Sequence, residues 1–248
     1  MLTYRHAGDA GDIIASLPVV RHFGRGDFLI EAATYTRQAL TPDKWGGLDL
    51  LLKQQPYIND VREWRREMVT INLNDFRAKL FKAIRVGQSK DKSLVDWHIE
   101  AHGLPLSLKD SAWLTVAEPI KAARVVFNRT GPGREPHHVY HNLMFPWHRV
   151  WQKYHQDAVF IGSKLEYDVF RNTCGEVPYY PTSNLLEAAR VIAGADLFVG
   201  NQSCCFWIAE GMKKKLVLEV WPQGPNSNVF RDGATQGFDQ NVWLPELL

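Results

Sequence analysis

Residues 184–222 decide the fold of this chain, with the sequence NLLEAARVIAGADLFVGNQSCCFWIAEGMKKKLVLEVWP. They predict a helix, a strand, a tight turn, a second helix and a second strand, in that order. Asn184 fits a helix N-cap, with Glu187 at the third helical position. Residues 197–199 and 216–218 are apolar without polar alternation, which is typical of parallel strands covered on both faces. The segment is therefore a βαβ unit, and it predicts an α/β protein.

The turn of this unit lies where the first strand ends and the second helix begins. It has the sequence Gly200-Asn201-Gln202-Ser203. Such a turn presents backbone N–H groups at a helix N-terminus, which is where anionic ligands bind. We therefore predict that these four residues contact an anionic ligand.

The N-terminus has the same order of strand, glycine-rich turn and helix. Residues 2–6 predict a strand, residues 7–12 a loop, and the apolar residues that follow a helix that ends near Gly24. Pro18 lies inside this helix, and we expect it to kink or restart the helix because proline removes one backbone hydrogen bond.

The remaining elements are shorter, and they follow from apolar runs and helical periodicity. Further strands are predicted at residues 28–33, 69–73, 124–127, 159–161 and 179–180. Helices are predicted at residues 76–86, 93–102 and 147–156. The segment up to Trp64 predicts no regular structure apart from residues 48–52, and no element is predicted in the tail, residues 223–248.

A linker divides the chain into two halves. Residues 104–119 have a proline at each end and no helical period, which is typical of a connection between domains. We therefore predict two Rossmann-like domains, residues 1–115 and residues 120–248, each built from a parallel sheet with helices. The two sheets are expected to face a cleft between the domains.

The composition is that of an ordinary globular protein. The chain has 248 residues, of which 45% are hydrophobic and 23% are charged, and its formal net charge is +2. This charge is too small to indicate a nucleic-acid partner. No apolar run is long enough for a membrane span, and residues 1–18 lack the apolar core of a signal peptide. With only three cysteines and no disulfide framework, we expect a cytoplasmic protein.

Asp12 is the candidate catalytic residue of the first half. The simplest interpretation of Asp9 and Asp12 is that one of them caps the helix that follows. The functional alternative makes Asp12 a general base, with Gly11 and Asp9 beside it on the acceptor side. The helix N-terminus would stabilise its anion, so that we expect a low pKa and a base that acts by position.

Residues 128–134, with the sequence NRTGPGR, are the candidate phosphate loop of the second half. One interpretation is a flexible loop with solvated arginines. The alternative is a phosphate grip, in which Asn128, Thr130 and backbone N–H groups hold oxygens. Arg129 or Arg134 would then neutralise a diphosphate leaving group.

Other motifs carry less information. His137, His138 and His141, and separately His98 and His102, lack a convincing third and fourth ligand, so we predict no metal site. Neither glycine-rich turn has the G-x-G-x-x-G spacing of a dinucleotide site, and no P-loop lysine motif is present. A nucleotide-sugar epimerase or hydrolase is therefore a minor alternative.

Two segments together resemble the ADP-heptose:lipopolysaccharide heptosyltransferase family, glycosyltransferase family nine. The first is residues 11–18, GDIIASLP, and the second is residues 186–201, LEAARVIAGADLFVGN. Residues 159–162, followed by Glu166, resemble the strand and turn that come before the second segment in that family. The resemblance covers both halves of the chain, and the motifs occur in the family's order.

The resemblance implies a GT-B-like fold, an acceptor site in the N-terminal half and a nucleotide-sugar site in the C-terminal half. It implies inverting sugar transfer without a metal or other cofactor, from a nucleotide-diphosphate sugar that is ADP-linked in the family, to a hydroxyl of a glycan or another acceptor. Asp12 is similar to the family's catalytic carboxylate, and residues 128–130 resemble its first donor-phosphate loop.

The sequence departs from the family where the second turn would touch the donor. Gln202, Ser203 and Cys204 stand where the family has D-[ST]-G, and Trp207 stands where it has a histidine. The usual lysine of the phosphate loop is missing, with Arg134 the nearest substitute, and the chain is shorter than the family norm. The alternative function is therefore a non-catalytic module that binds a nucleotide or a sugar with the same fold.

Overall fold

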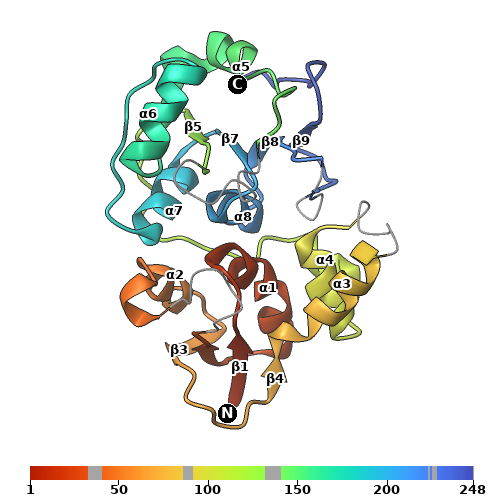
Figure 1. Cartoon of the computed structure of the whole chain (residues 1–248). Coiled ribbons are helices and arrows are strands. Elements are labelled where there is room, and N and C mark those ends of the chain that lie inside the picture. Colours follow the sequence, from red (N-terminus) through yellow and green to blue (C-terminus); the bar gives the residue numbers. More distant parts are fainter. Residues whose placement is uncertain (33–40, 86–91, 132–140, 223, 225–227, 248) are drawn as a thin grey trace.

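The computed structural model describes residues 1–32, 41–85, 92–131, 141–222, 224 and 228–247, which form two α/β halves (Figure 1). The first sheet has the strand order β3-β2-β1-β4 and the second the order β6-β5-β7-β8-β9, and every pairing is parallel. The first sheet consists of β1 (Leu2–His6), β2 (Gly26–Ile30), β3 (Ile58–Glu63) and β4 (Ile71–Asn72). The second consists of β5 (Val125–Asn128), β6 (Ala158–Phe160), β7 (Leu197–Asn201), β8 (Lys215–Glu219) and β9 (Ala234–Gly237). The predicted GT-B-like α/β fold with two parallel sheets is confirmed.

Helices follow the strands in both halves. The first half contains α1 (Ala10–Phe23), α2 (Leu48–Lys53), α3 (Phe76–Arg85) and α4 (Leu94–Ala101). The second contains α5 (Trp147–Tyr154), α6 (Lys164–Thr173), α7 (Leu185–Gly194) and α8 (Cys204–Gly211). The predicted N-cap of α7 is confirmed, because the Asn184 side chain accepts a hydrogen bond from the N–H of Glu187. No helix among the described residues is long and apolar enough to cross a membrane.

Each sheet has a switch point, at which successive strands are added on opposite sides. In the first sheet it lies between β1 and β4, and in the second between β5 and β7. Ligands of open α/β sheets bind beyond the carboxyl ends of the strands at such points. The fold therefore marks one candidate site in each half.

Two edge strands were not predicted from the sequence. β3 lies in the segment for which we predicted no regular structure, and β9 lies in the tail. Both carry polar residues and are partly exposed, so that they lack the apolar run of a central strand. Pairing with β2 and β8, rather than local sequence, holds them in the sheets. The edge strand predicted at residues 179–180 is only an isolated bridge between Tyr179 and Phe160.

Pro18 does not restart α1, which is one of the two outcomes that we predicted, and the predicted kink stays a prediction. The helix runs through Pro18 from Ala10 to Phe23. A proline at this position leaves the carbonyl of Ile14 without its usual N–H donor. The indole N–H of Trp113 donates to that carbonyl at 3.2 Å, so the linker supplies the missing hydrogen bond.

The two halves pack tightly against each other. α1 lies against α8 and α2 against α7, and one apolar core cluster contains buried residues of both halves. Trp113 also joins the halves, because its backbone N–H donates to the carbonyl of Gly211 in α8 at 2.9 Å. A cavity of about 30 Å³ at this junction is lined by Trp113 and Trp207, among others. The wider cleft that we expect between the domains stays a prediction.

A double-mutant cycle tests the bond between Trp113 and Ile14. We expect Trp113→Phe to lower the free energy of unfolding by about 1–2 kcal/mol through this hydrogen bond, in addition to a packing cost. In a Pro18→Ala background the N–H of residue 18 can satisfy Ile14, so Trp113→Phe should cost less there. The measurement is urea unfolding of the four proteins, and an equal cost in both backgrounds would contradict the assignment.

Candidate active site

Asp12 lies at the switch point of the first sheet. It occupies the third position of α1, directly after the carboxyl end of β1, and Asp9 is the N-cap residue of that helix. The Nη2 atom of Arg77 lies 3.2 Å from Oδ2 of Asp12, and 28% of the Asp12 side chain is exposed. Arg77 belongs to α3, which follows β4. The ion pair therefore spans the two elements that flank the switch point.

The pKa of Asp12 differs from our expectation. Burial raises the pKa of this carboxyl to about 6, and Asp9 adds to the rise, although Arg77 and the N–H of Asp9 lower it. Our prediction of a low pKa is wrong, because the lost hydration of the anion outweighs the favourable charges around it. Asp12 consequently changes its charge near pH 6.

Gly8 allows Asp12 to lie close to His6. A Cβ atom at residue 8 would lie 2.5 Å from Cε1 of His6 and 2.5 Å from Cβ of Asp12, so no larger residue fits without movement. The N–H of Gly8 donates to Nδ1 of His6 at 2.8 Å, which places the imidazole proton on Nε2. His6 is fully buried, and burial holds its pKa well below the ordinary value, so the ring is neutral at pH 7.

The two predicted donor loops meet at the switch point of the second sheet. The Asn201 side chain accepts a hydrogen bond from the N–H of Thr130 at 2.9 Å and donates to its carbonyl at 2.7 Å. Ser203 caps α8 by accepting from the N–H of Phe206, and its hydroxyl donates to the Asn128 side chain at 2.9 Å. These side chains hold the two loops together, so that the predicted binding of an anion would depend on backbone groups and on the first turn of α8.

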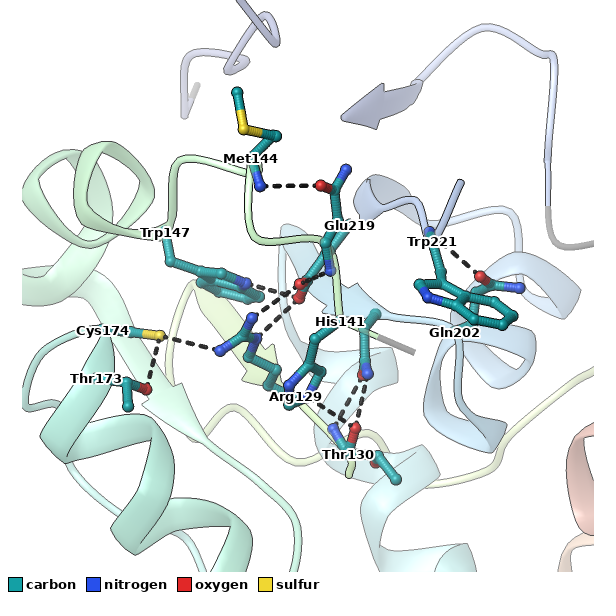
Figure 2. Close-up of polar contacts among 12 residues, drawn as sticks. Arg129, Thr130, His141, Met144, Trp147, Thr173, Cys174, Gln202, Glu219 and Trp221 are labelled. Carbon is teal, nitrogen blue, oxygen red and sulfur yellow. Dashed lines mark hydrogen bonds and ion pairs between the residues drawn. The ribbon is translucent and has the colours of Figure 1, made fainter. Parts of the chain in front are cut away.

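Gly200 and Gln202 complete this arrangement. A Cβ atom at Gly200 would lie 2.6 Å from the carbonyl oxygen of Asn128, so the glycine permits the close approach of β5 and β7. The amide of Gln202 donates to the carbonyl of Gly224 at 2.8 Å and accepts from the N–H of Trp221 at 3.3 Å. Figure 2 shows the Gln202 and Trp221 side chains next to each other.

Arg129 binds Glu219 rather than facing open solvent. Its Nε and Nη2 atoms each donate to one carboxylate oxygen of Glu219 at 2.9 Å (Figure 2). The indole N–H of Trp147 and the backbone N–H of Asn142 each donate to the same carboxylate at 2.7 Å. Burial opposes the charged form of Arg129, but Glu219 more than compensates and raises the Arg129 pKa. Arg129 is thus paired with Glu219 within the protein, and Arg134 lies outside the described residues. That Arg129 or Arg134 neutralises a leaving group stays a prediction.

The first turns of α1 and α8 bring the two candidate sites together. A Cβ atom at Gly11 would lie 3.1 Å from Cδ1 of Trp207 and 3.6 Å from Cα of Cys204. Asp12 follows Gly11, and Ser203 precedes Cys204, so the predicted base and the predicted donor turn lie on adjoining turns. That arrangement agrees with one composite site, although the role of each residue stays a prediction.

Metal ligands do not gather anywhere in the described part of the chain. No group of three or more His, Cys, Asp and Glu side chains there has the arrangement of a metal site. His98 is fully buried, with its ring 3.9 Å from that of Phe76, so it is a core residue of the first half. His137 and His138 lie outside the described residues.

Sequence reasoning missed Arg77 and Glu219. Glu219 carries a local signal, because it is a charged residue directly after the apolar run of residues 216–218. Arg77 carries none, since its contact with Asp12 depends on β4 lying next to β1.

Two Rossmann-like halves joined through α1 and α8, with a switch point in each, define a GT-B fold. Solved structures confirm this class. The chain resembles the E. coli heptosyltransferase WaaC with ADP (11% identity, TM-score 0.58, 95% of this chain and 92% of that one). It also resembles a glycosyl transferase family 9 structure from Veillonella parvula DSM 2008, with 10% identity and a TM-score of 0.58 over 95% of this chain and 84% of that one. A third similar structure is the E. coli ADP-heptose lps heptosyltransferase II, with 14% identity and a TM-score of 0.55 over 96% of this chain and 92% of that one. No protein-family model matches the sequence, and the search of curated proteins found no match.

The Arg129–Glu219 pair gives a test of this end of the sheet. Glu219→Gln leaves Arg129 buried without its counter-charge, so we expect the free energy of unfolding to fall by about 3–5 kcal/mol. Asp168→Asn, which removes an exposed pair with Lys164, is the control and should cost less than about 1 kcal/mol. Chemical unfolding measures both, and equal costs would show that Glu219 is not a structural partner.

Proposed function

We propose that this chain is a glycosyltransferase that moves a sugar from a nucleotide-diphosphate donor to an acceptor hydroxyl. Residues 1–115 would hold the acceptor and residues 120–248 the donor. The observation that supports this most directly is the position of Asp12, on the turn that contacts the first turn of α8. The GT-B fold, shared with heptosyltransferases, agrees with it.

In the proposed reaction Asp12 is the general base. Its carboxylate takes the proton of the acceptor hydroxyl while that oxygen forms a bond to the anomeric carbon. The bond between the anomeric carbon and the phosphate oxygen breaks, and the nucleotide diphosphate leaves with the electron pair. A single displacement of this kind inverts the anomeric configuration.

The donor end would be held by the paired loops around Asn128, Thr130, Asn201 and Ser203. Backbone N–H groups at the start of α8 would bind the diphosphate, whose charge grows as the bond breaks. The structures of WaaC with ADP and with ADP-2-deoxy-2-fluoro heptose favour an ADP-linked sugar for this chain. We propose that no metal cofactor takes part, that a glycan or other hydroxyl compound is the acceptor, and that the protein acts in the cytoplasm.

The second candidate function is a non-catalytic module that binds a nucleotide or a sugar. Gln202 favours it, because its amide is held by Gly224 and Trp221 within the protein. This candidate predicts nucleotide binding without sugar transfer.

Asp12→Asn separates the two functions. If Asp12 is the base, nucleotide diphosphate release from a panel of nucleotide sugars, with acceptor glycans present, should fall by about 10²–10⁴-fold. Asp49→Asn, another aspartate in the first turn of a helix of the same half, is the control and should keep the wild-type rate.

Binding is measured on the same proteins by the rise in melting temperature with ADP, GDP, UDP, CMP and TDP. A nucleotide that binds both the wild type and Asp12→Asn, with no release from either, would exclude transfer and support the binding module.

The pH dependence of transfer gives a further prediction. A general base must be ionised, and burial raises the pKa of Asp12 to about 6. We therefore expect kcat/KM to rise about tenfold per pH unit below pH 6 and to level off above it. Initial rates between pH 4.5 and 8, in buffers of about equal ionic strength, measure this limb.

The stability of the protein should follow the same ionisation. The ordinary pKa is 3.8, so the contribution of Asp12 to stability is full below that pH and is lost as the pH rises through about 6. Asp12→Asn should accordingly melt at an equal or higher temperature than the wild type at pH 7.5. A lower melting temperature there would contradict a raised pKa.

A further inference from the structure

Arg77 is packed more closely into the protein than the arginine of an ordinary surface ion pair. Its side chain is 21% exposed, and its guanidinium lies 4.9 Å from the ring centroid of Phe76. Phe76 is buried, and its ring centroid lies 3.9 Å from that of His98, at a tilt, and 6.0 Å from that of His6, on which it stacks. The guanidinium of Arg77 therefore packs on a group of buried rings that come from β1, α3 and α4.

The segment before α3 is also bound to the loop that leads into α1 and Asp12. The Asn74 side chain accepts a hydrogen bond from the N–H of Ala7 at 2.9 Å. Asn72 in turn accepts from the backbone and side-chain N–H groups of Asn74 at 3.3 and 3.0 Å. These bonds cross the switch point, so Arg77 is held at a fixed distance from α1.

From these contacts we propose that Arg77 is the positioning residue of Asp12. It would hold the carboxylate through Oδ2, leave Oδ1 to take the proton of the acceptor hydroxyl, and keep the group in its ionised form. The proposal rests on the proposed function for its catalytic part. Its electrostatic part concerns Asp12 and Arg77 alone and can be tested without any substrate.

The charged groups around Asp12 agree with this role. Arg77 is the neighbouring cation that lowers the pKa of Asp12, whereas Asp9 and burial raise it. His6, on β1, and His98, on α4, are neutral at pH 7 because burial keeps their pKa values well below the ordinary range. On α8, the backbone of Cys204 and the indole of Trp207 lie nearest to Gly11 at the start of α1. Among these groups, Arg77 supplies the positive charge.

The test is a pH profile of transfer for Arg77→Met, which keeps an unbranched apolar stem and removes the charge. Loss of a cation within hydrogen-bonding distance should move the acid limb of kcat/KM upward by about one pH unit or more. The rate at pH 6 should fall about fivefold or more and recover above pH 8. Arg77→Lys should restore most of the shift. Lys82→Met, which removes an exposed cation from the same helix, should leave the profile unchanged.

A second measurement does not depend on catalysis. In protein with ¹³C-labelled aspartate, the carboxyl signal of Asp12 is identified by its absence in Asp12→Asn, and its titration is followed in the wild type and in Arg77→Met. A higher midpoint in Arg77→Met supports the proposal. An unchanged midpoint, or a rate that falls by one factor at every pH, would overturn it. Failure of the proposed function would instead appear as no nucleotide release from the wild type, with the ¹³C result unaffected.

Discussion

The contact between the first turns of α1 and α8 is the constraint on which the rest of the site depends. Gly11 lets Trp207 approach to within 3.1 Å of the place of a Cβ atom, and Trp207 is itself buried. Trp113 strengthens the contact, since it bonds to α1 at Ile14 and to α8 at Gly211. Both switch points are thereby fixed relative to each other, so that packing of α1 against α8 holds Asp12 near the predicted donor turn.

The same contact explains part of the departure from the heptosyltransferase pattern. Trp207 stands where the family has histidine, and here its ring fills the junction between the halves. Gln202 joins the turn after β7 to the segment after β8. Two positions at which the resemblance implies donor contacts therefore make contacts within the protein here. The proposed donor contacts depend more heavily on the backbone of the two loops as a result.

The sequence predicts central elements far better than contacts between distant residues. Residues 184–222 define β7, α8 and β8 because buried parallel strands need apolar runs and helices need caps. The edge strands β3 and β9 lack such runs, and they form only because a neighbouring strand is present. Pro18 shows the same limit. The hydrogen bond that Pro18 removes from α1 is replaced by one from Trp113, which lies far away in the chain.

Within the site, the residue types were predictable but their charges were not. Asp12 was a candidate because a carboxylate after a strand and before a helix is well placed for a ligand. Its pKa depends on burial and on Arg77, and Arg77 reaches it only through the order of the strands. Likewise, the sequence alone gives no partner for the charge of Arg129. In the fold, both carboxylate oxygens of Glu219 accept hydrogen bonds from it.

The Arg129–Glu219 and Arg77–Asp12 ion pairs differ in geometry and burial. The Arg129–Glu219 pair is bidentate at 2.9 Å, with Glu219 fully buried and two further donors on its carboxylate, so it holds the sheet end rigidly. The Arg77–Asp12 pair is longer, at 3.2 Å, and partly exposed. A base needs a pKa high enough to attract the proton and low enough to be ionised at the working pH. A tighter pair would lower the basicity of Asp12, and loss of the pair would raise its pKa further, so the looser geometry of Arg77 agrees with the proposed role of Asp12 as a proton acceptor.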